Sequence, residues 1–343
     1  MTFRQMPRRW ISIAVASTGI ASLMIATGPA SHAAQSIAAV QAEVTTLQIR
    51  ASAIAESAQQ SQVNLIALTR SLNSIKAKDS VQTTSLTALK RSIGILAAEQ
   101  YKNGFLGQGM TLMFSSDPTQ YLNSAQSLSV VETQNAVRMR KFAAADIALK
   151  STALTLNQKV ALVAAAKAKY QAQEAEAQAE LKKAEKLLAG LTKAQRAKLE
   201  ALQRSQDSAY QKKSLALAKG KIKATGAEAI ALKYALKQLG SRYMFGAAGL
   251  VYWDCSGLTM RALQQAGISV PHSAAAQTAY GKYVPLNKIQ PGDLVFFGQP
   301  ITHVGIYFGN GKMVDAPHTG ARVRIETFGH WFGGEKFVAA RRF

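Results

Sequence analysis

Cys255 is the only cysteine in this chain of 343 residues. His303 follows it by 48 residues, and Asp315 lies another 12 residues further on. Nucleophilic catalysis by a thiol needs these three groups, because the histidine takes up the thiol proton and the carboxylate orients the histidine. We therefore predict that Cys255 is a nucleophile, His303 its base and Asp315 the orienting group.

The sequence after Cys255 predicts a helix that begins at the cysteine and ends at Gln265, just before Gly267. The first backbone N–H groups of a helix have no partner within it, and the helix dipole favours negative charge there. We expect this position to lower the pKa of the thiol and to let the backbone N–H of Cys255 donate to an oxyanion. The alternative is that Cys255 is a small, inert core side chain.

His303 begins a predicted strand, 303–308, which a tight turn at 309–311 joins to a second strand, 312–315. An antiparallel hairpin of this kind brings Asp315 back toward His303, where a carboxylate can fix the tautomer and orientation of the imidazole. His318, three residues beyond Asp315, could serve instead. We favour Asp315 because it lies on the strand rather than in the turn that follows.

Residues 227–343 combine predicted helices with a later series of predicted strands. The helices come first, at 228–239, 255–265 and 273–280. The strands follow, at 293–297, 303–308, 312–315, 323–326 and 336–340. This order is typical of an α+β domain, and a region of this length can hold a core of its own.

Three segments of this region resemble the motifs of a known family. They are Asp254-Cys255-Ser256-Gly257-Leu258, the run QPGDLVFF at 290–297 and the run HVGIYFGNG at 303–311. Their order and spacing are similar to those of the NlpC/P60 family of bacterial cell-wall cysteine peptidases. The resemblance implies a papain-like fold with the cysteine on a helix packed against a β-sheet. It also implies hydrolysis of peptidoglycan stem peptides, typically between D-γ-glutamyl and the following diamino acid.

The resemblance also implies roles for individual residues. The nucleophile, the base and the third polar group of the family match Cys255, His303 and Asp315. Further positions near the oxyanion or along the substrate cleft match Tyr243, Asp254 and Ser256. Asp254 equally fits a cap for the helix that begins at Cys255.

The segment before the cysteine departs from the family pattern. Relatives often read Pro-Tyr-X-Trp-Gly-Gly there, whereas residues 242–247 read RYMFGA. The tyrosine is kept, but the tryptophan and one glycine are missing, which indicates a cleft wall of different shape.

Residues 34–219 have a different composition, rich in Ala, Gln, Lys, Leu and Glu, with Pro118 as the only proline. Two rows of every seventh residue, starting at Ile37 and Val40, are apolar at 15 of 18 positions, which predicts a coiled-coil helix. Glycines and Pro118 at 103–118 predict a turn, and a second long helix at about 119–219 then completes an antiparallel hairpin. Because residues 34–226 lack Cys and His, we expect this arm to do no chemistry itself. Residues 220–226 read as a linker.

The predicted tip of the hairpin carries a weaker resemblance. The runs 99–104 (EQYKNG) and 112–118 (LMFSSDP) are similar to the tip of coiled-coil arms on some secreted wall hydrolases. In those relatives the arm can restrain the peptidase and engage a membrane cell-division complex that activates it. The resemblance therefore implies a regulatory or positioning arm.

The first 33 residues are typical of an export signal, with arginines at the start, an apolar run at 11–26 and the small-residue site Ser31-His32-Ala33. The apolar run is short for a permanent span, although an uncleaved anchor is the alternative. We expect a secreted or cell-wall-associated protein with no later transmembrane segment. A lone cysteine then leaves no internal disulfide.

The formal net charge of +22 predicts attraction to polyanions. Outside the cytoplasm these are wall polymers such as peptidoglycan and lipid headgroups, so nucleic acid is not an expected partner. A merely solvated helix surface is the alternative. The sequence holds no His/Cys/Glu cluster typical of a metal site, and we expect no cofactor.

Two other functions remain open from the sequence alone. A wall-binding or scaffold protein could carry a vestigial peptidase-like domain, but the intact Cys255, His303 and Asp315 argue against it. Acyl transfer on the same triad, with an amine in place of water, would use the same residues.

Overall fold

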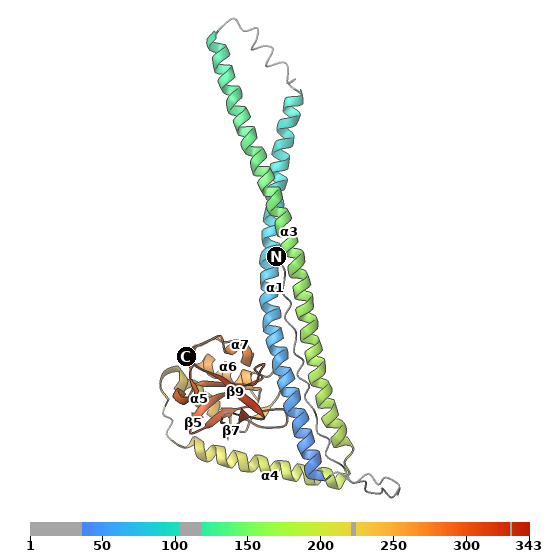
Figure 1. Ribbon diagram of the computed structural model, residues 1–343, viewed down its shortest axis with the longest axis vertical. Helices are drawn as coiled ribbons and strands as arrows, with labels where there is room; N and C mark the ends of the chain where they lie inside the picture. The colour runs from blue at the N-terminus through green and yellow to red at the C-terminus, as the bar shows by residue number, and fades with distance from the viewer. Residues whose placement is uncertain (1–35, 103–117, 221–223, 330) are drawn as a thin grey trace, which may run out of the picture. The chain divides into compact units, whose positions relative to one another are not determined.

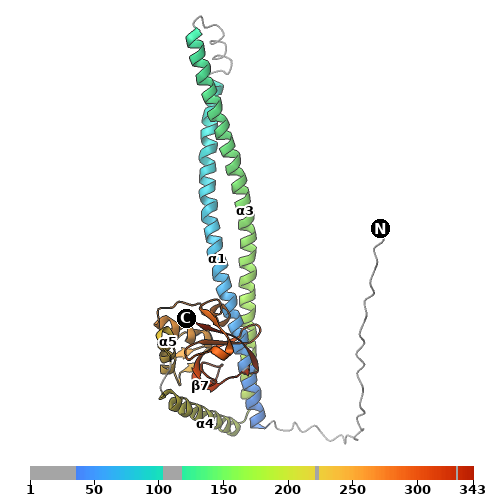
Figure 2. The same cartoon turned by 60° about the vertical axis from the view of Figure 1, so that its left-hand side comes forward.

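The N-terminal half of the molecule is a pair of long helices. The computed structural model describes residues 36–102, 118–220, 224–329 and 331–343. Helix α1, Ile37–Lys102, and helix α3, Pro118–Ala189, pack against each other along their length (Figure 1, Figure 2). The predicted coiled-coil hairpin is therefore confirmed. The predicted export signal at 1–33 and the centre of the predicted turn lie outside the described residues.

Helices α1 and α3 are antiparallel, because residues further along α1 contact residues that come earlier in α3. Near the start of α1, Val40 and Val44 pack with Ala184 of α3. Further along α1, Ser61 Oγ donates a hydrogen bond of 2.6 Å to Gln173 Oε1. The predicted seam is buried at several of its apolar positions, among them Ala51, Ala58, Leu72 and Leu86. The heptad pattern thus identifies the packed face.

The helix predicted at 119–219 is not continuous, and that prediction is wrong. It ends at Ala189, and a separate helix, α4, spans Lys193–Ala218. Thr192 caps α4: its Oγ1 accepts from the backbone N–H of Gln195 at 3.3 Å, and its own N–H donates to Gln195 Oε1 at 2.9 Å. Gly190, a poor helix former, lies just before this capping box, so the sequence ends one helix and starts another.

The C-terminal region is an α+β domain, as predicted. Its helices are α5 Gly226–Lys237, α6 Cys255–Gln265 and α7 Ala274–Gln277, with a 3₁₀ turn at Leu286–Lys288. Its strands are β1 Arg242–Tyr243, β2 Tyr252–Trp253, β3 Lys282–Val284, β4 Leu294–Phe297, β5 His303–Gly309, β6 Lys312–Asp315, β7 Arg324–Thr327, β8 Trp331–Phe332 and β9 Glu335–Arg342. The five predicted strands are present, whereas the short strands β1, β2, β3 and β8 were missed.

The main sheet is antiparallel, in the order β3-β9-β4-β5-β6-β7, with β8 paired to β9. Alternate residues of β4 point to its two faces, as in any pleated strand. Leu294 and Phe296 join the larger core, which also holds side chains of α5 and α6. Val295 and Phe297 join a second, aromatic core on the other face. Because β4 is buried on both faces, its sequence is continuously apolar.

Helix α4 lies against β7, the last strand of the sheet. Ser214 Oγ accepts from the backbone N–H of Ile325 at 2.9 Å, and Gln211 Nε2 donates to the carbonyl of Val323 at 3.1 Å. These side chains satisfy backbone groups that a sheet edge leaves unpaired. A helix that precedes the predicted domain start at 227 therefore completes the edge of its sheet.

In the described part of the chain, none of the helices combines the length and the apolar character needed to cross a bilayer.

Candidate active site

Cys255 is the first residue of α6, as predicted, and it is buried. Asp254 caps the helix, since its Oδ1 accepts from the backbone N–H of Gly257 at 2.7 Å. A Cβ at Gly257 would lie 2.4 Å from the carbonyl oxygen of Ala247, so only glycine fits there. The Asp-Cys-Ser-Gly run thus fixes both the start of the helix and its close approach to the preceding loop.

His303 and Asp315 are paired, as the predicted hairpin requires. His303 Nε2 lies 2.9 Å from Asp315 Oδ2, and both side chains are buried. Because an ionised carboxylate only accepts, this bond places the hydrogen on Nε2 and leaves Nδ1 as the free acceptor. Phe332 stacks on the imidazole at 4.7 Å between ring centroids. Burial lowers the pKa of His303 to about 4, so the ring is neutral and able to take up a proton.

His318, the alternative third residue, does not contact His303 through a hydrogen bond. Its Nδ1 lies 2.8 Å from the carbonyl oxygen of its neighbour Thr319. Of the two candidates, Asp315 is therefore the one that is hydrogen-bonded to His303.

Cys255, His303 and Tyr243 line one cavity, so the structure brings these predicted site residues together. The cavity has a volume of only about 30 Å³. Ser52 and Ala53 of α1 form part of its wall. The cavity is small because the coiled-coil helix covers it.

Glu56 of α1 reaches the thiol. Its Oε2 accepts from Cys255 Sγ at 3.4 Å and from Ser256 Oγ at 2.9 Å. Its Oε1 accepts from the backbone N–H of Ala274 at the start of α7. Glu56 is buried by these contacts. An acid from the arm therefore occupies the space beside the candidate nucleophile.

Gln59 of α1 contacts Asp254 and Ser256, the two remaining residues that the family resemblance matched to the substrate cleft. Its Nε2 donates to Asp254 Oδ2 at 2.7 Å, and its Oε1 lies 2.8 Å from Ser256 Oγ. Next to it, Gln60 Oε1 accepts from Ser273 Oγ at 2.8 Å. The polar groups at the start of α6 and α7 are thus bonded to α1. The arm, which was expected to do no chemistry itself, thus contacts the site directly.

The docked helix also sets the electrostatics of the site. Burial, with the charges of Glu56 and Asp254, raises the pKa of the Cys255 thiol well above its ordinary value. The predicted lowering of this pKa by the helix start is therefore wrong for the docked arrangement. Burial and the charge of Asp254 raise the pKa of Glu56 from 4.5 to about 7. Burial likewise raises the pKa of Tyr243, with the charges of Cys255 and Asp254 adding to it.

His272 lies beside Asp254 and is partly buried. Its Nε2 lies 2.8 Å from Asp254 Oδ1, and its side chain is 25% exposed. Burial lowers the pKa of His272, but the hydrogen bond and the charge of Asp254 outweigh it and raise the pKa overall.

Glu56 and Gln59 were missed because they lie away from the heptad seam, on the face that a coiled coil normally gives to solvent. One signal was present in the sequence. Residues 51–69 contain no lysine or arginine, although the whole chain has 41. A stretch of small and uncharged polar residues on an otherwise basic helix indicates a face that is covered.

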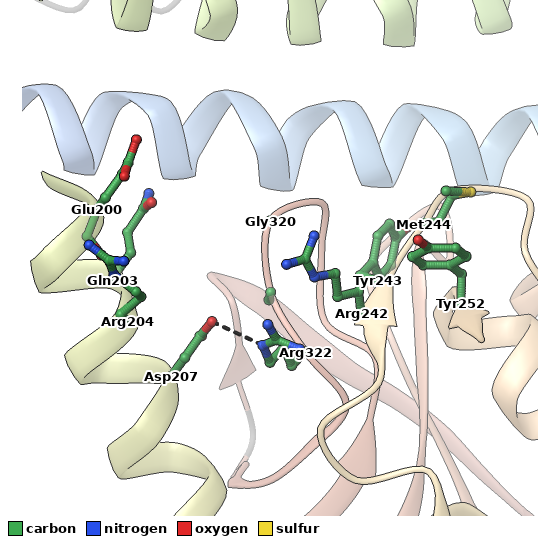
Figure 3. Close-up of a pocket in the computed structure, with 11 residues that line it drawn as sticks. Glu200, Gln203, Arg204, Asp207, Arg242, Tyr243, Met244, Tyr252, Gly320 and Arg322 are labelled. Atoms are coloured by element: carbon green, nitrogen blue, oxygen red, sulfur yellow. Dashed lines mark hydrogen bonds and ion pairs between the residues drawn. The ribbon is translucent and has the colours of Figure 1, made fainter. Parts of the chain in front are cut away.

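A second, larger cavity also has Tyr243 in its lining (Figure 3). It has a volume of about 520 Å³ and is lined by α4, by β1 and β2, and by the loop at 320–322. Arg242 and Tyr252 lie on one side of it, facing α4, and Arg322 is paired with Asp207 of α4 at 3.3 Å (Figure 3). Since Tyr243 lines both cavities, this space adjoins the catalytic one.

Comparison with known proteins gives a family match for the C-terminal domain. The model of the NlpC/P60 family matches residues 240–342. A probable endopeptidase of Mycobacterium tuberculosis strain H37Rv is 43% identical over 102 residues, which are 30% of this chain and 26% of the relative. The probable endopeptidase p60 of Listeria monocytogenes is 44% identical over 90 residues, 26% of this chain and 19% of the relative. The chain thus spans about a quarter or less of the length of these relatives.

Two solved structures are similar to the same region. The Resuscitation Promoting Factor Interacting protein RipA is 29% identical, covering 34% of this chain and 62% of that one with a TM-score of 0.31. NlpC2 from Trichomonas vaginalis is 28% identical, covering 36% of this chain and 48% of that one with a TM-score of 0.33.

A model of PIF1-like helicases matches residues 2–196, which contain α1 and α3. A nucleotide-driven helicase needs a glycine-rich loop followed by Lys and Ser or Thr to hold phosphates. No glycine in these residues is followed by lysine. We therefore assign no helicase function to these residues.

An α+β domain with a cysteine at a helix start, and a histidine–carboxylate pair on adjacent strands, defines a papain-like domain. Residues 240–342 therefore form a C-terminal domain of the NlpC/P60 type.

Proposed function

We propose that this protein is a thiol endopeptidase that hydrolyses the stem peptides of peptidoglycan. The observation that carries the proposal is that Cys255 and His303 line one cavity, with His303 hydrogen-bonded to Asp315. Curated relatives of the domain named probable endopeptidases support it. The resemblance of its motifs to the NlpC/P60 family favours cleavage of the bond between D-γ-glutamyl and the diamino acid. We place this activity outside the cytoplasm, in wall remodelling or cell separation.

Cys255, His303 and Asp315 each have a separate role in the proposed reaction. Nδ1 of His303 takes the proton of Cys255, and the thiolate attacks the peptide carbonyl. The unpaired N–H groups at the start of α6 stabilise the oxyanion, and the imidazolium then protonates the leaving amine. His303 next removes a proton from water, which releases the acyl group from Cys255. Asp315 keeps the ring in one tautomer throughout.

We infer that α1 regulates this site by covering it. Glu56 and Gln59 take the hydrogen-bonding groups of Cys255, Ser256 and Asp254 that a substrate would need. A raised thiol pKa adds to the effect, because less thiolate is present. Activity then requires α1 to leave the cleft. A membrane cell-division complex that engages the arm is the kind of partner that would drive this.

The test compares four full-length proteins on purified peptidoglycan. In the wild type, Gln59 Nε2 donates to Asp254 at 2.7 Å. Gln59→Glu replaces this donor by a carboxylate that repels Asp254, so we expect α1 to leave the cleft and the rate of peptidoglycan hydrolysis to rise. Gln60→Glu is the matched control, because its carboxylate still accepts from Ser273. Cys255→Ala in the Gln59→Glu protein should abolish cleavage.

Each result decides between functions. Equal digestion with and without Cys255 would refute the thiol peptidase and leave a wall-binding scaffold. Equal rates for the wild type and Gln59→Glu would refute regulation by α1. Transfer to an added amine acceptor in preference to water would indicate an acyl transferase.

A further inference from the structure

Asp315 has a buried oxygen that the triad does not explain. Its Oδ2 bonds to His303, but its Oδ1 is buried and has no hydrogen-bond partner among the described residues. Glu326 shows the same pattern: its Oε2 accepts from Arg324 Nη2 at 2.8 Å, whereas its Oε1 is buried without a partner in the same part of the chain. A buried acceptor without a donor is costly, so two together call for a cause.

The strand register brings these groups to one place. Asp315 of β6 is paired with Arg324 of β7. Glu326 lies two residues beyond Arg324 and therefore on the same face of the sheet. Two facing carboxylates cannot satisfy each other, because both only accept, but one proton between them turns one oxygen into a donor.

We propose that Glu326 is a positioning residue of the active site, which shares one proton with Asp315 through Glu326 Oε1 and Asp315 Oδ1 and so holds Asp315 against His303. This role rests on the proposed function, since only a reacting His303 needs an oriented partner. The orienting group is then a pair of carboxyls with a single negative charge rather than an isolated aspartate.

The acidities of the two groups agree with this arrangement. Burial raises the pKa of Asp315 to about 7, and burial together with the charge of Asp315 raises that of Glu326 to about 7. Such a pair holds one proton at neutral pH, and the proton belongs to the pair rather than to either residue. The charged or titratable groups around it are His303 on β5, Arg324 on β7, His318 in the loop after β6, Glu335 on β9 and Tyr210 on α4.

Arg324 links the carboxyl pair to α4. Its guanidinium carbon lies 4.3 Å from the ring centroid of Tyr210 of α4, a cation–π contact. The neighbouring Ile325 N–H bonds to Ser214 of the same helix. The supports of His303 thus run through Asp315, Glu326 and Arg324 to a helix that lies outside the 240–342 family match.

The experiment measures hydrolysis of a defined stem peptide in the full-length Gln59→Glu protein, in which α1 is expected to be released. Glu326→Gln keeps a donor for Asp315 and an acceptor for Arg324, so kcat should stay within about three-fold of the parent. Glu326→Ala leaves Asp315 Oδ1 without a donor, and kcat should fall roughly ten-fold with KM unchanged. Tyr210→Phe keeps the ring and should behave as the parent, whereas Tyr210→Leu should move toward Glu326→Ala.

A second readout does not depend on catalysis. Nitrogen NMR of labelled histidine follows the His303 ring from pH 5 to 9, with Asp315→Asn to assign it. In the parent, the His303 signal should shift near pH 7 as the carboxyl pair loses its proton. In Glu326→Gln that shift should be absent. This readout also decides the case if Glu326→Ala fails to fold.

A merely structural ion pair between Glu326 and Arg324 predicts the opposite. Glu326→Gln would then lose as much activity as Glu326→Ala, and the NMR shift near pH 7 would persist or be absent from the parent as well. Either result overturns the shared proton. Failure of the proposed function looks different, because the Cys255→Ala protein would then cleave as fast as its parent while the NMR result stands by itself.

Discussion

Replacing Glu56 by Gln should make closure of the site by α1 independent of pH. The undocked carboxyl has an ordinary pKa of 4.5, and docking raises it to about 7. The docked state therefore prefers the protonated acid. Docking is fully favoured below pH 4.5 and weakens as the pH rises through 7. The difference between the two pKa values corresponds to about 3 kcal/mol, or roughly a 300-fold weaker docking equilibrium above pH 8.

Glutamine keeps an acceptor for Ala274 N–H, turns an N–H donor toward Ser256 Oγ and adds no charge, so it imitates the protonated acid at every pH. At pH 8 the Glu56→Gln protein should be more tightly closed than the wild type, and this difference should shrink steadily toward pH 5 and vanish below pH 4.5. The charged or titratable groups that face Glu56 are Asp254, Cys255 and His272.

The assay is alkylation of the single thiol by iodoacetamide, followed by mass spectrometry of intact protein. The alkylation rates from pH 5 to 9 are divided by those of the Gln59→Glu protein at the same pH. This division corrects for the ionisation of the Cys255 thiol itself. Glu43→Gln, an exposed position on the same helix, is the matched control. Protection that changes with pH in the same way for the wild type and Glu56→Gln would refute the linkage to Glu56.

Three further substitutions test the supports of the site, each by urea unfolding of the full chain. Gly305→Ala places a Cβ 2.7 Å from Met313 Sδ on the neighbouring strand, so we expect the free energy of unfolding to fall by about 1–3 kcal/mol and activity to fall with it. Unchanged stability would show that β6 shifts to make room at no cost. Ser214→Ala leaves the N–H of Ile325 without its acceptor, which should cost about 1–3 kcal/mol unless water replaces it. Thr192→Ala removes the cap of α4 and should cost about 1 kcal/mol, whereas no loss would mean that packing alone fixes the start of α4.

The local elements of the site could be predicted because their signals are short-range. The helix start at Cys255 and the hairpin that returns Asp315 to His303 follow from capping, alternation and turn residues within a few positions. The hairpin of α1 and α3 follows from an uninterrupted heptad pattern. The break between α3 and α4 was signalled by Gly190 and Thr192 but was outweighed by the helical composition around them.

The contacts between distant segments could not be predicted in the same way. Glu56 lies 199 residues from Cys255, and nothing in either motif states that the two meet. The thiol pKa was therefore predicted from the helix start alone, and the added burial and acidic neighbours reversed its direction. The same holds for Tyr210 and Arg324, which meet only because α4 lies on the sheet edge.

The most direct test of the account is mass spectrometry of defined stem peptides incubated with the full-length Gln59→Glu protein. We predict products cut between D-γ-glutamyl and the diamino acid, and none when Cys255→Ala is added to the same protein. The same products from both proteins, or none from either while α1 is shown to be released, would contradict it.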